Sequence, residues 1–356
     1  MRVGAFVLAA QFPGQGQSEP LHRALRTGEV AEEAGLDAVW LAEHHFVPYG
    51  VCPSAVTLAA LLLGRTRRIG VGTAVSVLPN AHPVALGEQT ALLHLTSGGR
   101  FTLGVGRGGP WIDLEVFGGG LGAYEHGFPE ALDLLLRWLR EPRVGADGER
   151  YRFREVEVVP RADEPFADTE PGLRVPPSRE PPVVVACTSP GTVRLAARRG
   201  LPMLLGMHCG DEEKAEIVSL WHREARDAGH GAEKIEEAAA QHVSAGVAQV
   251  SDHTGEAVES LTKSLPGWLS TGLGAHRTVD GRRRPMRDPL SYTELLCRLH
   301  PVGTPRLCAD RLAATRERTG ISRFALLVEG TGDLAATERN VQRLGEEVLP
   351  LLPPAS

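Results

Sequence analysis

Short apolar runs alternate with longer amphipathic segments over most of the chain. The runs predicted as strands are Val3–Leu8, Ala38–Ala42, Ile69–Ala74, Phe101–Gly106, Val183–Ala186, Met203–Leu205, Val243–Val250 and Phe324–Val328. Segments with helical periodicity, such as Glu19–Ala34 and Pro83–Leu95, lie between them. Strands that alternate with helices form parallel sheets through right-handed crossovers. We therefore predict an α/β fold, a (β/α)8 TIM barrel, with an open doubly wound sheet as the alternative.

One stretch departs from this alternation after the fourth strand. Residues 140–180 follow a predicted helix at Phe128–Leu139 and are rich in proline, arginine and acidic residues. They contain a predicted hairpin formed by Arg150–Arg154 and Glu157–Pro160. We interpret them as an insertion within a single domain that spans residues 1–356.

A second irregular stretch runs over residues 264–290. It carries Pro266, Pro285 and Pro289 among several glycines. Long irregular stretches inside compact domains are often active-site lids. The sequence therefore predicts a mobile lid over 264–290.

Composition narrows the class of protein. The chain has 356 residues, is 42% hydrophobic and 23% charged, and has a net charge of -6, which excludes disordered, collagen-like and coiled-coil chains. No basic surface for nucleic acid is indicated, and no apolar run approaches the roughly 20 residues needed to span a membrane. The apolar start Val3–Ala10 is too short for a signal peptide. The five cysteines include no C-x-x-C pair, so we expect no metal site, no disulfide framework and a cytoplasmic location.

The segment Trp40-Leu-Ala-Glu-His-His-Phe46 ends the second predicted strand. In a barrel that end faces the active site. Neighbouring side chains on a strand point to opposite faces, so His44 and His45 cannot both reach one ligand. One of them is a candidate acid or base, since imidazole titrates near pH 6.5. The alternative is a pair of structural histidines.

Two strand ends could bind an anion. Gly104-Val-Gly-Arg-Gly-Gly109 offers backbone amides and the charge of Arg107, although Pro110 and Trp111 stand where a dinucleotide-binding helix would begin. Ala186-Cys-Thr-Ser-Pro-Gly-Thr192 is a strand-to-helix turn, a natural seat for phosphate. The alternatives are a tight turn with a solvated arginine and ordinary helix capping.

Small and apolar residues mark a possible pocket. The strand end Gly72–Val75 could let a flat ring approach the backbone, and Met203, Met207 and Trp268 could line an apolar cavity. Core packing is the more frequent role for such residues.

Together these segments resemble the luciferase-like flavin monooxygenases, and most strongly the α subunit of bacterial luciferase. The resemblance covers most of the chain and rests on ordered matches at Val39–Phe46, Val71–Ala74, Leu78–Val84, Ser97–Phe101, Arg107–Gly108 and Pro301–Pro305. It implies the same barrel with an inserted lid. It also implies reduced FMN as cofactor, or the deazaflavin F420 in some branches.

The resemblance assigns roles to particular residues. It makes His44 the catalytic histidine, Arg107 a phosphate-binding arginine and Phe6 a residue near the flavin ring. It places a non-proline cis peptide bond between Ala74 and Val75, under that ring. The phosphate seat is completed by the turn formed by Cys187, Thr188, Ser189 and Thr192.

Other positions have a structural role or depart from the family pattern. His45 and Glu88 match positions that are structural or lie at a subunit interface. The predicted substrate pocket differs because Gly106 replaces a cysteine and Met207 replaces a tryptophan, while Trp268 is kept. Glu125 replaces a second phosphate-contacting arginine, and Cys187 replaces an acidic residue.

The resemblance implies a flavin-dependent monooxygenase that uses reduced FMN and O2, through a C4a-(hydro)peroxyflavin, to oxygenate an apolar organic substrate. A secondary metabolite is one candidate substrate, and a separate flavin reductase is the expected source of reduced FMN. A homodimer formed near Glu88 is expected from the family. The alternatives are an F420-dependent hydride-transferring oxidoreductase and a non-catalytic flavin-binding subunit.

Overall fold

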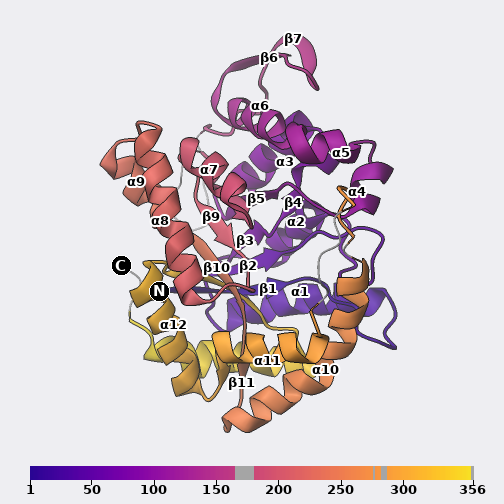
Figure 1. Ribbon diagram of the computed structural model, residues 1–356, viewed down its shortest axis with the longest axis vertical. Coiled ribbons are helices and arrows are strands. Elements are labelled where there is room, and N and C mark those ends of the chain that lie inside the picture. The colour runs from indigo at the N-terminus through magenta and orange to yellow at the C-terminus, as the bar shows by residue number, and fades with distance from the viewer. Residues whose placement is uncertain (165–179, 276, 282–286, 354–356) are drawn as a thin grey trace.

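A closed barrel of eight parallel strands forms the centre of the protein (Figure 1). The computed structural model describes residues 1–164, 180–275, 277–281 and 287–353. Around the barrel the strands are β1 (Arg2–Val7), β2 (Ala38–Leu41), β3 (Gly70–Thr73), β5 (Phe101–Gly106), β8 (Val183–Cys187), β9 (Met203–Leu205), β10 (Val243–Val247) and β13 (Arg323–Leu327). Strand β13 pairs with both β10 and β1, which closes the ring. The predicted TIM barrel is confirmed, and the open sheet is excluded.

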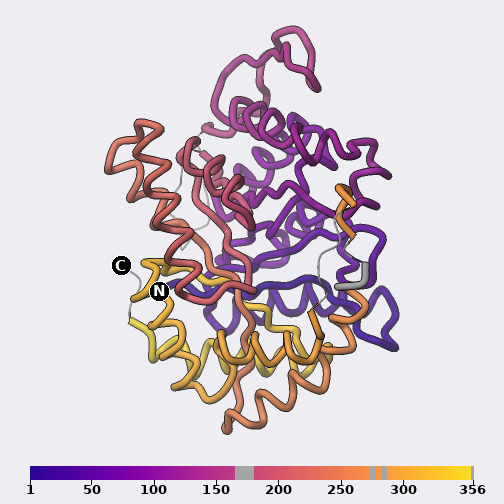
Figure 2. Tube along the Cα trace, in the orientation of Figure 1, coloured from indigo at the N-terminus to yellow at the C-terminus, as the bar shows by residue number. Residues whose placement is uncertain are grey.

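Helices surround the barrel on its outer side (Figures 1 and 2). They are α1 (Ser18–Glu33), α2 (Ala55–Arg65), α3 (Pro83–Thr96), α4 (Trp111–Val116), α5 (Gly120–Gly122), α6 (Phe128–Arg140), α7 (Pro190–Arg198), α8 (Asp211–Asp227), α9 (Ala232–Ala239), α10 (Thr254–Ala275), α11 (Pro289–Leu299), α12 (Pro305–Thr319) and α13 (Leu334–Arg343). None of the helices in the described part of the chain is long and apolar enough to cross a membrane.

The strands are apolar on both faces because both faces are buried. Ala5 and Val7 of β1 belong to the core between the barrel and its helices. Phe6, between them, belongs to a second core that fills the barrel interior. Side chains alternate in the same way along β8 and β9.

The insertion contains a two-stranded hairpin, with different bounds from those predicted. Strand β6 (Arg143–Asp147) pairs antiparallel with β7 (Arg152–Glu157), and the hairpin extends beyond α6 (Figure 1). The predicted first strand thus covers the turn and the start of β7. Residues 165–179 of the insertion lie outside the described residues.

The prediction of an irregular lid from residue 264 is wrong for its first part. Helix α10 continues to Ala275 with Pro266 inside it. A Cβ at Gly272 would overlap the ring of Tyr49, so this glycine serves close packing rather than a break. Residues 276 and 282–286 of the predicted lid lie outside the described residues.

Candidate active site

The carboxyl ends of the strands meet at one mouth of the barrel, where parallel barrels carry their active sites. Five of the predicted site residues contribute to the interior apolar cluster that extends to this mouth. They are Phe6, Ala74, Val75, Met207 and Trp268. The structure therefore brings together the residues predicted to face the flavin ring and the substrate.

The floor of the mouth is formed where β3 ends. Both β3 and the short β4 (Ser76–Val77) pair with β5, and the Ala74–Val75 peptide bond between them is cis, as predicted. The hydroxyl of Thr73 donates to the carbonyl oxygen of Gly104 at 2.7 Å and accepts from the amide of Gly104 at 2.9 Å. A Cβ at Gly104 would overlap the Thr73 carbonyl. The first glycine of the glycine-rich segment therefore serves strand packing.

Gly106 and Val75 share one space on this floor. The Cγ2 atom of Val75 lies 2.5 Å from the position that a Cβ at Gly106 would take. The methyl group of Ala186 lies 3.7 Å from the same position. The absence of a side chain at residue 106 is therefore compensated by the branched side chain of Val75.

His44 is half-buried and stands at one end of a row of aromatic rings. Its ring meets Tyr49 edge-on with centroids 5.1 Å apart, and Tyr49 stacks on Trp268 at 4.3 Å. Trp268 donates from Nε1 to the carbonyl oxygen of Tyr49 at 2.8 Å and also stacks on Phe12 at 5.7 Å. Sequence reasoning missed Tyr49 and Phe12, because both lie on loops without a periodic pattern.

His45 makes the contacts of a structural residue. Its Nε2 lies 3.5 Å from a carboxylate oxygen of Glu43, and its ring packs on Phe117. The same carboxylate accepts from the amides of Val77 at 3.0 Å and Ala55 at 3.2 Å. Glu43 thus connects the end of β2 to β4 and to the start of α2. Because His45 contacts this carboxylate, we assign it a structural role, distinct from that of His44.

Arg107 is held by an aromatic residue rather than by a carboxylate. Its guanidinium lies 4.0 Å from the ring centroid of Tyr124, and its Nη2 donates to the Tyr124 hydroxyl at 3.0 Å. Among the described residues it forms no ion pair, so its charge is available to an anion. Glu125, next to Tyr124, is exposed and lies 3.8 Å from His126.

The predicted phosphate turn caps helix α7. The Ser189 hydroxyl accepts from the amide of Thr192 at 3.4 Å, and the Thr192 hydroxyl accepts from the amide of Ser189 at 3.3 Å. Pro190 has no amide hydrogen, and no partner among the described residues accepts from Gly191. The Gly191 amide and the exposed Thr188 hydroxyl are therefore the donors left for an anion at this positive helix end.

Cys187 does not present its side chain to the mouth. Its thiol belongs to the core between the barrel and the helices, and burial raises its pKa, with the Thr192 hydroxyl opposing this effect. All five cysteines are buried free thiols. Only the backbone of Cys187 can contribute to a ligand site.

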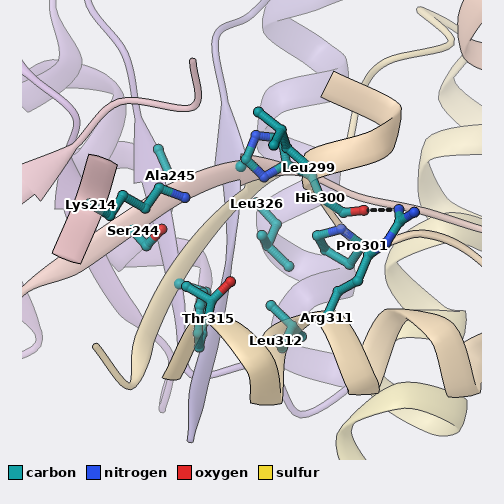
Figure 3. Close-up of a pocket in the computed structure, with 12 residues that line it drawn as sticks. Lys214, Ser244, Ala245, Leu299, His300, Pro301, Arg311, Leu312, Thr315 and Leu326 are labelled. Atoms are coloured by element: carbon teal, nitrogen blue, oxygen red, sulfur yellow. Dashed lines mark hydrogen bonds between the residues drawn. The ribbon is translucent and has the colours of Figure 1, made fainter. Parts of the chain in front are cut away.

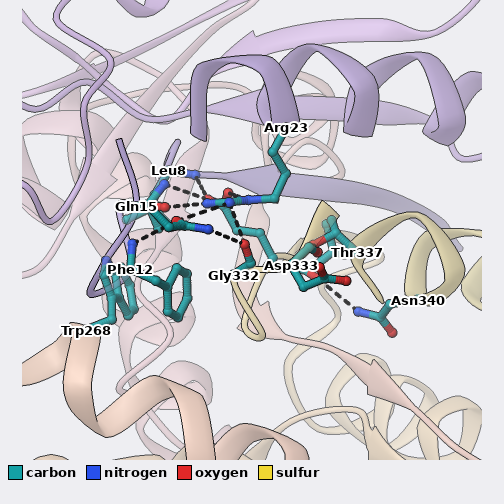
Figure 4. A network of polar contacts seen from close by, with 12 residues as sticks. Leu8, Phe12, Gln15, Arg23, Trp268, Gly332, Asp333, Thr337 and Asn340 are labelled. Atoms are coloured by element: carbon teal, nitrogen blue, oxygen red, sulfur yellow. Dashed lines mark hydrogen bonds and ion pairs between the residues drawn. The ribbon is translucent and has the colours of Figure 1, made fainter. Parts of the chain in front are cut away.

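A buried ion pair fixes the loop that carries Phe12 (Figure 4). Glu329 follows β13 and accepts from the amides of Leu8 at 2.6 Å and Ala10 at 3.3 Å. Arg23 of α1 donates to its second oxygen at 3.2 Å. Burial raises the pKa of Glu329, and Arg23 is the largest opposing cause. This network, which sequence reasoning missed, places the ring of Phe12 against Trp268.

The loop that carries Met207 is anchored from behind. His300 donates from Nε2 to the Met207 carbonyl oxygen at 2.6 Å. His300 also lines a small cavity of about 10 Å³ with Lys214 and Ser244 (Figure 3). That cavity lies between β10, β13 and helices α8 and α12, outside the barrel wall, so it is separate from the mouth.

Part of the predicted lid contacts the loop after β5. The amide of Val279 donates to the carbonyl oxygen of Gly109 at 3.0 Å. The amide of Trp111 donates to the carbonyl oxygen of Arg277 at 2.8 Å. Residues 277–281 therefore lie across the loop that begins at Arg107.

The chain is similar to known proteins over almost its whole length. The family model for luciferase-like monooxygenases matches residues 1–323. The alkanal monooxygenase alpha chain of Photorhabdus laumondii subsp. laumondii is 30% identical over 369 residues, covering 99% of this chain and 98% of that protein.

Solved structures share the fold over almost their whole length. Monooxygenase RslO1 from Streptomyces bottropensis has a TM-score of 0.80 at 23% identity and covers 98% of this chain and 99% of its own. The oxygenating constituent of 3,6-diketocamphane monooxygenase of Pseudomonas putida, solved with FMN, has a TM-score of 0.75 at 18% identity, with 99% of each chain covered. An F420-dependent secondary alcohol dehydrogenase has a TM-score of 0.71 at 17% identity, again with 99% of each chain covered. The family match and the near-complete overlap with the alkanal monooxygenase chain show that this chain belongs to the luciferase-like monooxygenase family.

Proposed function

We propose that the protein is a monooxygenase that binds reduced FMN and uses O2 to oxygenate an apolar organic substrate. The observation that carries this proposal is the convergence of three features at one mouth. These are an apolar floor at Ala74–Val75, an imidazole at His44, and the guanidinium of Arg107, which forms no ion pair within the described part of the chain. When bound, reduced FMN would supply the electrons that activate O2.

The residues present fit this cofactor. Arg107, the Gly191 amide and the Thr188 hydroxyl would hold the phosphate. Phe6 and the Ala74–Val75 segment would support the ring. Cys187 would contribute through its backbone only, and Ser189 and Thr192 by shaping the turn.

His44 would act as a general acid or base at the reacting centre. Its Nδ1 lies 2.8 Å from the position that a Cβ at Gly50 would take, so this nitrogen faces the backbone. We assign proton exchange to the other ring nitrogen, Nε2. The packing of Tyr49 against the His44 ring would fix its orientation.

The walls of the mouth would exclude water, which preserves reactive oxygen species in such sites. The stacked rings of Tyr49, Trp268 and Phe12 close one side. Residues 277–281 cross the loop after β5, on the side of Arg107. Gly106, Met207 and Trp268 would border the space for the substrate.

A second copy of the chain and a reductase are the partners we propose. Leu61 of α2 and Leu92 of α3 are about half exposed, at 48% and 54%, and Glu88 is exposed on α3. These side chains would lie in the interface near Glu88 that the family resemblance implies. A separate flavin reductase would deliver reduced FMN, in the cytoplasm.

Hydride transfer with F420 is the second candidate, because an F420-dependent dehydrogenase shares the fold. The proposal is tested by mixing the protein with photoreduced FMN and O2 and following flavin absorbance. We expect reoxidation much slower than that of free reduced FMN. Reoxidation at the protein-free rate, together with binding of F420 in preference to FMN, would favour the second candidate.

A further inference from the structure

A buried cation lines the small cavity outside the barrel wall. Lys214 of α8 is only 2% exposed, and it contributes to the lining of this cavity of about 10 Å³. The described residues provide no hydrogen bond or ion pair to its amine, and none of those that line the cavity is a carboxylate. Because lysine is almost never fully buried without a partner, this amine points to a ligand in the cavity.

Three elements contribute polar side chains to the cavity (Figure 3). Lys214 comes from α8, Ser244 from β10 and Thr315 from α12. Ser244 is buried, and its hydroxyl has no partner within the part of the chain that the structure describes. Thr315 instead donates to a carboxylate oxygen of Asp211 at 2.9 Å. The Lys214 amine and the Ser244 hydroxyl are therefore the donors left for a ligand.

The surroundings of the cavity are positively charged. Arg311 also lines it, and its guanidinium donates to three backbone carbonyl oxygens, those of Cys297, His300 and Val302. These oxygens carry no net charge, so they do not neutralise the guanidinium. Burial lowers the pKa of Lys214, and Asp211 is the largest opposing cause. A buried ammonium without a counter-charge costs free energy, which a bound anion would offset.

The volume of the cavity limits the ligand to one small sphere. About 10 Å³ is close to the lower limit for a single water molecule. Polyatomic anions such as phosphate exceed this limit, whereas a halide ion is only slightly larger than water. Cavities that stay empty are apolar, so a polar cavity of this size is expected to be filled. The positive charge favours an anion over a neutral water molecule.

We propose that this cavity binds a single chloride ion, held by the Lys214 amine and the Ser244 hydroxyl. The site is separate from the mouth of the barrel, and it does not depend on the proposed function. His300 lines the cavity and also donates to the Met207 carbonyl oxygen at 2.6 Å. The ion would therefore stabilise the wall that anchors the loop of Met207.

Bromide, which scatters X-rays anomalously, tests the site directly. In crystals of the wild-type protein soaked in sodium bromide, we expect an anomalous difference peak in contact with Lys214 Nζ and Ser244 Oγ. Crystals of Lys214→Met, which keeps the length of the side chain but removes its charge, should lack this peak. A water molecule in the wild-type cavity, without anomalous signal, would overturn the proposal.

Thermal unfolding tests the site in solution. The melting temperature of the wild-type protein should rise by about 1–3 °C as chloride replaces gluconate, an anion too large for the cavity, from about 2 to about 200 mM at constant ionic strength. Ser244→Ala should reduce this rise, and Lys214→Met should abolish it. Lys234→Met, at an exposed lysine of α9, should leave it unchanged.

An equal rise in the Lys214→Met protein would show a general salt effect and would overturn the proposal. A bromide peak without any chloride dependence in solution would indicate an adventitious ion only, with the same consequence. If Lys214→Met does not fold, the wild-type peak and the Ser244→Ala comparison decide, since Ser244→Ala keeps the buried ammonium.

Discussion

The side chain of Val75 fills the space that a side chain at position 106 would need, with its Cγ2 2.5 Å from that Cβ position. Gly106→Ala should therefore force Val75 to move and lower the free energy of unfolding by about 1–3 kcal/mol, the usual cost of overpacking. Because Val75 forms the floor of the mouth, FMN affinity should fall as well. Urea unfolding and an FMN titration measure the two effects.

A double variant provides the control for this pair of residues. Val75→Ala combined with Gly106→Ala should restore most of the stability that Gly106→Ala loses. Gly109→Ala should be nearly neutral, because the nearest atom to a Cβ there is 3.9 Å away. A stable Gly106→Ala protein with unchanged FMN affinity would contradict the relationship.

Arg107 should determine how tightly the phosphate is held. Arg107→Met keeps the length of the side chain but removes its charge, and FMN affinity should fall by about 10- to 100-fold, since hydrogen bonds to charged groups contribute about 1.5–3 kcal/mol. Tyr124→Phe removes only the hydroxyl that orients the guanidinium, so a smaller loss is expected. Fluorescence titration with FMN measures both. Arg306→Met, at an exposed ion pair of α12, is the matched control, and an equal loss there would count against the assignment.

His44 and His45 should respond differently to substitution. His44→Ala should lower oxygenation turnover by at least about 100-fold, the usual contribution of a general acid or base, while FMN affinity stays close to that of the wild type. His45→Ala should instead lower thermal stability, because the ring packs between Glu43 and Phe117. Turnover that survives in His44→Ala would point to a non-catalytic subunit.

Acid should destabilise the fold through two buried histidines. Burial lowers the pKa of His242 and of His300 to about 3. His242 also accepts a hydrogen bond from the amide of Met203, which requires its neutral form, whereas the bond from His300 to the Met207 carbonyl oxygen only partly opposes the effect of burial. Between pH 6.5 and 3 the unfolded chain binds protons that the folded chain does not, so stability is lost as the pH falls through this range. The loss is on the order of 2 kcal/mol per histidine by pH 5. Urea unfolding against pH measures it, and His242→Gln should flatten the curve; an unchanged curve would refute this cause.

Much of the fold could be predicted because buried parallel strands are continuous apolar runs. The predicted strands at Phe101–Gly106 and Met203–Leu205 have the observed bounds. The second half of helix α10 could not be predicted, because Pro266 and Gly272 are residues that usually end a helix. Gly272 lies within the helix because the Tyr49 ring occupies the space that a side chain there would need, a contact between residues far apart in the chain.

The candidate site could be predicted only where its residues end strands. His44, Arg107 and the Ala74–Val75 bond lie at such ends, so barrel geometry and the family resemblance located them. Phe12 and Glu329 lie in loops, and Tyr124 lies in a short π-helix before α6, where nothing in the local pattern indicates which residues meet. The outward direction of Cys187 follows from strand alternation and could have been anticipated.

The most direct test of the account is the crystal structure of the protein with FMN bound. The account predicts the phosphate within hydrogen-bonding distance of Arg107 and the first turn of α7, and the ring against Ala74–Val75 beside His44. A phosphate bound at another face of the protein, or a ring held away from His44, would contradict it.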